Sequence, residues 1–288
     1  MTNPTFRANN FESGLSITSG ARLVSEQASP RTFFGSIAML FVVCVAVTTV
    51  WCNSMSATGE MPMPGGWTMS MAWMRMPGQT WAGATASFVL MWVVMMAAMM
   101  LPSLAPVLWR YRQSLWRTRK TFRGLLTTLV GLGYFVVWTL FGLVIFPLGA
   151  ATATIEMEQP TLARAAPIAA GLVVLIAGTV QFTKGKAHHL TSCREAPGRD
   201  HVLSAHPGAA WRLGLHFGLH CGLSCANLTA VLLVVGVMDL RAMAAITAAI
   251  TAERLAPAGT HVARAIGLVV VGAGLILIAR AAGVPMMQ

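Results

Sequence analysis

The stretch that decides the fold is WAGATASFVLMWVVMMAAMMLPSLAPVLW, residues 81–109, which contains no Asp, Glu, Lys or Arg. As a helix rising about 1.5 Å per residue, it is long enough to cross the ~30 Å hydrocarbon core of a bilayer. The next residues, 110–123, hold six Lys and Arg, which is typical of the end of a membrane span. We therefore interpret residues 81–109 as a transmembrane helix.

Similar apolar runs lie on both sides of this helix. They cover residues 33–52, 125–152, 167–182, 213–238, 242–255 and 265–284. The run 242–255 is short and rich in Ala, so we expect seven spans, with six as the alternative. Residues 33–284 would then form a single transmembrane helical domain, behind a polar, disordered cytoplasmic tail at residues 1–32.

Composition supports the same fold class, an all-α polytopic membrane helix bundle. Of the 288 residues, 56% are hydrophobic and 10% are charged, whereas about 25% of residues in soluble domains are charged. This excludes a soluble globule, a disordered chain and a disulfide-rich secreted domain. The sequence has no phosphate-binding loop, nucleophile elbow, zincin motif or paired carboxylates in a usable context, so we do not predict an enzyme.

The basic residues predict the topology. With the N-terminus in the cytoplasm, sixteen of the 20 Lys and Arg face inward, as the positive-inside rule requires. We expect the bacterial inner membrane, with an outer Met-rich loop at 53–80 and an inner His/Cys loop at 183–212. The net charge of +11 then reflects contact with the lipid bilayer, and we expect no nucleic-acid partner.

The outer loop contains three Met-x-Met pairs, formed by Met61, Met63, Met69, Met71, Met74 and Met76. A thioether is a soft, neutral ligand that suits Cu(I) or Ag(I) better than Zn(II), Mg(II) or Ca(II). The pairs therefore predict copper(I) binding outside the membrane. The alternative is an interfacial helix whose Met and Trp side chains lie among the lipid headgroups.

The span 81–109 adds more methionines to this set. Met91, Met95 and Met99 are four residues apart, so they form a stripe on one helix face. Together with the loop, the stripe would make a ladder of thioethers that leads copper inward. The alternative is that these side chains face lipid or serve as packing.

The inner side carries different ligands. Six of the seven His and three of the five Cys lie between residues 188 and 225. Polar groups within a span are costly and usually serve function. We predict a metal site made of His216, His220, Cys221 and Cys225, with His189 and Cys193 as further ligands. The alternatives are hydrogen bonds between helices and Cys acting as packing, the role we assign to Cys44 and Cys52.

Glu253 and Arg254 stand at the inner end of run 242–255. We interpret them as anchors of a helix end, with a functional ion pair inside the membrane as the alternative.

From about residue 81 to 278 the chain resembles a bacterial family of predicted metal-binding integral membrane proteins of unknown function. The likeness rests on the run Met95 to Pro102 with Trp92 and Pro106, and on later residues that include Gln181, Cys193, Pro197, Gly214, Gly218, Cys221, Cys225, Gly236 and Glu253. The family pattern has a cysteine where this chain has His189 and another where it has Ser224. The first exchange keeps a metal ligand and the second removes one. The resemblance implies metal binding.

Taken together, these patterns predict an integral membrane protein that handles copper(I), by uptake, transfer or delivery to a membrane cuproenzyme or metallochaperone. An alternative is a non-catalytic accessory or assembly subunit of a larger membrane enzyme complex, such as a copper oxidase or monooxygenase. A haem redox enzyme is a third reading, but His216 and His220 share one helix face and cannot be opposed axial ligands of one haem.

Overall fold

The structure is a computed structural model that describes residues 30–57, 61–64, 66–75, 78–115, 118–194 and 206–283. Most of the predicted N-terminal tail, together with Met76, lies outside these residues, and the side chain of Cys193 does too.

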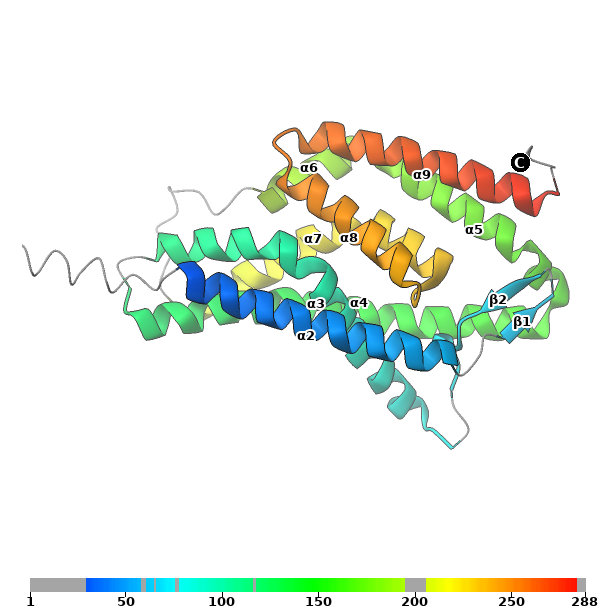
Figure 1. Ribbon diagram of the computed structural model, residues 1–288, viewed down its shortest axis with the longest axis horizontal. Coiled ribbons are helices and arrows are strands. Elements are labelled where there is room, and N and C mark those ends of the chain that lie inside the picture. The colour runs from blue at the N-terminus through cyan, green and yellow to red at the C-terminus, as the bar shows by residue number, and fades with distance from the viewer. Residues whose placement is uncertain are drawn as a thin grey trace, which may run out of the picture.

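The described part of the chain is almost entirely helical (Figure 1). Its helices are α2 (Pro30–Ala57), α3 (Trp81–Ser114), α4 (Lys120–Glu158), α5 (Pro160–Val180), α6 (Lys184–Arg194), α7 (Pro207–Gly236), α8 (Leu240–Leu255) and α9 (Gly259–Ala281). Between α2 and α3 lie two short antiparallel strands, β1 (Met61–Met63) and β2 (Trp67–Met69), and a 3-10 turn, η1 (Met71–Trp73). The predicted all-α polytopic bundle is confirmed.

Local sequence signals explain where key helices begin. Thr80 caps α3, since its hydroxyl accepts a hydrogen bond from the Gly83 amide at 3.1 Å. Asp239 caps α8 in the same way through the amides of Arg241 and Ala242. Both caps satisfy amides that the first helical turn leaves without a partner.

Six helices of the described chain are long and apolar enough to cross a membrane, namely α2, α3, α4, α5, α7 and α9. The structure therefore supports the alternative count of six spans. The run expected as the remaining span forms α8, whose 16 residues reach only ~24 Å at 1.5 Å per residue. One face of this helix packs against the bundle, where Met243, Ile246, Ile250 and Glu253 are buried.

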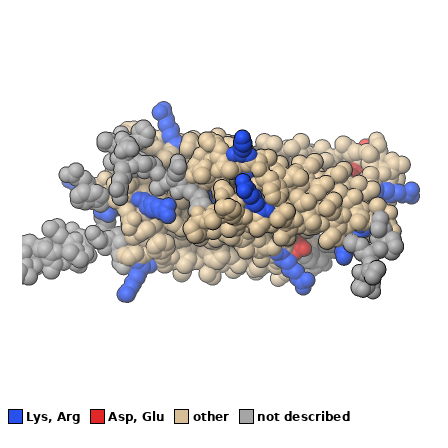
Figure 2. Space-filling model, turned by 90° about the horizontal axis from the view of Figure 1, so that it is seen from above, with Lys and Arg blue, Asp and Glu red and all other residues tan. Residues whose placement is uncertain are grey.

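The helices form two neighbouring groups (Figure 1). Helices α2, α3, α4 and α7 make up one group, while α5 and α9 pair side by side with α8 close to both groups. Close contact between α4 and α7 depends on glycine, because a Cβ on Gly214 would lie 2.3 Å from the Val130 carbonyl oxygen. Lys and Arg side chains stand isolated on the face drawn in Figure 2, and many large hydrophobic side chains of the described helices are exposed, as expected for helices that face lipid.

Two ends of the bundle are useful landmarks. The hairpin end contains β1, β2, the end of α4 and the start of α5. The basic end, at the opposite side of Figure 1, contains the start of α2, the end of α3 and the starts of α4 and α7. Its basic side chains include Arg110, Arg112, Arg119, Arg123 and Arg212.

Candidate metal centre

In the centre of the bundle, a methionine thioether contacts a cysteine thiol. Met100 of α3 and Cys221 of α7 are both fully buried, and their sulfur atoms are 3.9 Å apart. Met100 belongs to a row with Trp92 and Met96, spaced four residues apart and wholly buried. This row faces the core because the Trp92 indole donates a hydrogen bond to the Trp138 carbonyl of α4 at 3.0 Å.

A second thiol completes the group. Cys225 lies one turn beyond Cys221 on the same face of α7 and is also buried. The Tyr134 hydroxyl of α4 lies 2.8 Å from the Cys221 sulfur, and the Ser224 hydroxyl lies 3.6 Å from the Cys225 sulfur. We call Met100, Cys221 and Cys225 the sulfur site. It joins α3 and α7, with α4 supplying a hydroxyl.

The donor set of the sulfur site fits a soft monovalent metal. Among the described residues, no three His, Cys, Asp or Glu side chains are grouped so that they could hold a metal ion. The sulfur site reaches three donors only because Met100 supplies a thioether. Two thiols and a thioether, buried away from water, select Cu(I) over hard cations such as Mg(II).

The histidines gather on another side of α7. The Nδ1 atoms of His189 in α6 and His220 in α7 are 3.2 Å apart, and the His216 and His220 ring centroids are 4.3 Å apart. His216 is exposed and His220 is partly exposed. We call His189, His216 and His220 the histidine cluster. Beside it, at the basic end, His216, Arg212 and Tyr111 help to line a groove of about 720 Å³.

The four ligands expected to form one site therefore lie in two environments. Cys221 and Cys225 point into the core, whereas His216 and His220 border the surface next to α6. The Cys pair follows the His pair by five residues, which is about 140° around a helix of 3.6 residues per turn, and this offset explains the separation. Cys193 belongs to α6, in a part of the expected inner loop that is helical.

The methionine stripe is buried. Met91, Met95 and Met99 are each at most 5% exposed and belong to the main core, so the lipid-facing alternative is wrong for them. Met96 and Met100 were not among the predicted ligands, although Met100 is the methionine that touches Cys221. Their four-residue spacing from Trp92 indicates that the three residues share a helix face, but the burial of that face comes from the neighbouring helices.

Three of the predicted outer methionines, Met61, Met63 and Met69, lie in a hairpin. Met61 pairs with Met69 and Met63 with Trp67, so these four side chains lie on one face of the two strands. Met63 and Met69 are buried against Ala153 of α4 and Ala163 of α5, and the Trp67 indole donates to the Ala163 carbonyl at 2.8 Å. The segment is therefore a docked hairpin and not an interfacial helix. Met71 and Met74 are partly buried just beyond it.

One more pair of sulfur atoms lies in the described core. The Cys52 thiol of α2 is 3.8 Å from the Met238 sulfur, beyond the end of α7. Cys44, two turns earlier in α2, is buried as well. These cysteines provide matched controls for the sulfur site.

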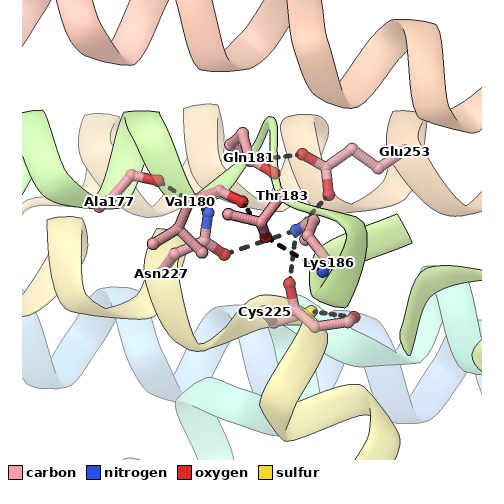
Figure 3. Close-up of polar contacts among 9 residues, drawn as sticks. Ala177, Val180, Gln181, Thr183, Lys186, Cys225, Asn227 and Glu253 are labelled. Atoms are coloured by element: carbon pink, nitrogen blue, oxygen red, sulfur yellow. Dashed lines mark hydrogen bonds and ion pairs between the residues drawn. The ribbon is translucent and has the colours of Figure 1, made fainter. Parts of the chain in front are cut away.

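A buried ion pair adjoins the sulfur site (Figure 3). The Lys186 Nζ atom of α6 lies 2.8 Å from the Glu253 Oε2 atom of α8, and both side chains are at most 3% exposed. Glu253 also accepts a hydrogen bond from the Gln181 amide at 2.7 Å. Glu253, interpreted from sequence as a helix-end anchor with Arg254, thus pairs with Lys186 of α6, and Arg254 donates to the Ser103 hydroxyl of α3 at 3.1 Å. No sequence pattern pointed to Lys186.

A comparison with family models identifies one match. The model of a family described as PpoB2, copper chaperone, matches residues 89–277. This stretch contains the sulfur site, the histidine cluster and the buried ion pair, and it nearly coincides with residues 81–278, on which the resemblance to metal-binding membrane proteins rested. No curated protein and no solved structure matches the chain.

Proposed function

Because the chain belongs to the PpoB2 copper chaperone family, we propose that it is a membrane-embedded chaperone that carries Cu(I) at the sulfur site. The observation that carries the proposal is the contact between the Met100 thioether and the Cys221 thiol, with Cys225 beside them. Copper is the cargo in this proposal and not a resident catalytic cofactor.

The chemistry of the three donors supports reversible loading. Cu(I) binds well to a small number of soft ligands. Each thiol must lose its proton to become a ligand, so loading releases protons to water. A chaperone must also give its metal up, and a site with only three protein donors leaves room for a ligand from the receiving protein.

The remaining candidate ligands suggest a route through the molecule. Methionines of the hairpin segment would capture copper, and the buried stripe would line its way along α3. The members of these two sets are Met61, Met63, Met69, Met71, Met74 and Met76, then Met91, Met95 and Met99. Beyond the sulfur site, the histidine cluster and Cys193 would exchange copper at the surface.

We propose that this route crosses a bacterial inner membrane, with the N-terminus and the basic end in the cytoplasm. The fourteen Lys and Arg of residues 1–32, 110–123 and 183–212 would then be cytoplasmic. The partner would be a membrane cuproenzyme or another metallochaperone that meets one of the two ends.

The experiment measures Cu(I) binding to detergent-purified protein in competition with a chromogenic Cu(I) chelator under reducing conditions. The double variant Cys221→Ala/Cys225→Ala should lose the tightest site, by about one copper per chain. The matched variant Cys44→Ala removes a buried thiol of α2 and should bind as the wild type does. Unchanged copper binding in the double variant would refute the sulfur site and favour an accessory subunit.

A further inference from the structure

Two positively charged side chains approach the sulfur site from helices that carry none of its three donors. Lys186 comes from α6 and Arg254 comes from the end of α8. Lys186 donates to the carbonyl of Ser224, the residue before Cys225, and Arg254 donates to the hydroxyl of Ser103, three residues beyond Met100. Charges inside a membrane protein are costly, so they are usually kept for function.

Lys186 is held beside the Cys225 peptide by several partners (Figure 3). Its ammonium donates to the Ser224 carbonyl at 2.5 Å and lies 3.5 Å from the Asn227 side-chain oxygen. Asn227 in turn donates to the Ala177 carbonyl of α5 at 3.0 Å. Since Glu253 is fixed by Gln181, the ammonium has a defined place next to the turn of α7 that carries Cys225.

Arg254 is linked to the turn that carries the thioether. Its guanidinium donates to the Ser103 hydroxyl at 3.1 Å, and this hydroxyl donates to the Met100 carbonyl at 3.0 Å. The two cations therefore reach the two ligand-bearing helices, Lys186 through α7 and Arg254 through α3. This arrangement places positive charge near the donors without adding a ligand.

The charge of the loaded site depends on the metal. Cu(I) or Ag(I) with two thiolates and a neutral thioether has a net charge of minus one, whereas Zn(II) with the same ligands is neutral. In a low-dielectric interior, nearby cations favour the anionic complex and give little to the neutral one.

We propose that Lys186 and Arg254 are positioning residues that make the sulfur site selective for soft monovalent ions over divalent ions. The inference rests on the proposed function, because it requires Cys221 and Cys225 to bind metal as thiolates. Their two protons leave to water when the metal enters. The positive charge around the site provides this selectivity, in addition to the preference of sulfur ligands for soft metals.

The test compares Ag(I) and Zn(II) binding to detergent-purified protein by competition with chelators. Arg254→Gln should weaken Ag(I) binding by about tenfold, since one positive charge beside an anionic complex is lost. Zn(II) binding should stay unchanged or become tighter. Arg254→Lys keeps the charge and should retain the wild-type ratio of the two affinities. Lys184→Gln, an exposed change in the same helix as Lys186, should leave both affinities unchanged.

The outcomes separate this inference from the proposed function. If Arg254→Gln weakens Ag(I) and Zn(II) equally, the arginine has only a structural role and the inference is overturned. If the wild type binds neither metal at Cys221 and Cys225, the proposed function fails first. The double variant Lys186→Gln/Glu253→Gln removes the buried pair without leaving a lone charge. It should reduce the Ag(I) to Zn(II) affinity ratio by less than Arg254→Gln does, because Glu253 offsets most of the charge of Lys186, and an unchanged ratio would refute the role of Lys186.

Discussion

The hairpin and the sulfur site present the same element, sulfur, in two different ways. The hairpin places the thioethers of Met61, Met63 and Met69 on one face, at one end of the bundle. The sulfur site combines one thioether with two thiols in the centre, with two cations near them. Thioethers bind without losing a proton, whereas thiols must ionise. On this difference we base the proposal that the hairpin, at one end of the bundle, exchanges copper and that the centre retains it.

Breaking the buried ion pair should have the largest effect, and it should affect the sulfur site rather than the hairpin. Lys186→Ala leaves Glu253 buried without its partner, which should cost about 3–5 kcal/mol of stability. The damage should be at the centre, so Cu(I) retention should fall as well. Thermal unfolding in detergent, followed by intrinsic fluorescence, measures the first effect.

Two further variants serve as controls for this prediction. The double variant Lys186→Ala/Glu253→Ala should recover much of the stability, because it leaves no uncompensated charge. Lys184→Ala changes an exposed lysine of the same helix and should leave the unfolding temperature unchanged. A Lys186→Ala protein as stable as the wild type would show that the ion pair is not a structural link.

A smaller effect should distinguish the two kinds of thioether. Met100→Leu keeps the side-chain volume and should weaken the tightest Cu(I) site by about tenfold, since one of three donors is lost. The matched variant Met61→Leu/Met63→Leu/Met69→Leu should leave that affinity unchanged and slow the loading of copper. Stopped-flow transfer from a Cu(I)-chelator complex measures both quantities. A triple variant that loses the tight site would contradict the division of roles.

The sequence predicted the elements better than it predicted the contacts between them. Hydrophobic run lengths gave the membrane helices, and only the Ala-rich run at α8 proved too short for a span. Helical spacing puts the His pair and the Cys pair on separate faces of α7, although all four residues were predicted to form one site. Periodicity cannot tell which face is buried, because that depends on the neighbouring helices.

The residues missed from sequence are those whose roles come from distant partners. Met100 and Cys221 are 121 positions apart, and Lys186 was one of many basic residues in a region interpreted as an inner loop. Lys186 is buried because α6 packs against α7 and α8. There its ammonium contacts Glu253 of α8 and the Ser224 carbonyl of α7. No local pattern contains that information.

X-ray absorption at the copper edge tests the central claim most directly. Protein loaded with one equivalent of Cu(I) should show an all-sulfur ligand shell. Replacement of the methionines by selenomethionine should add a selenium neighbour that disappears in Met100→Leu and persists in the hairpin triple variant. A shell dominated by nitrogen, or a selenium signal unaffected by Met100→Leu, would contradict the sulfur site.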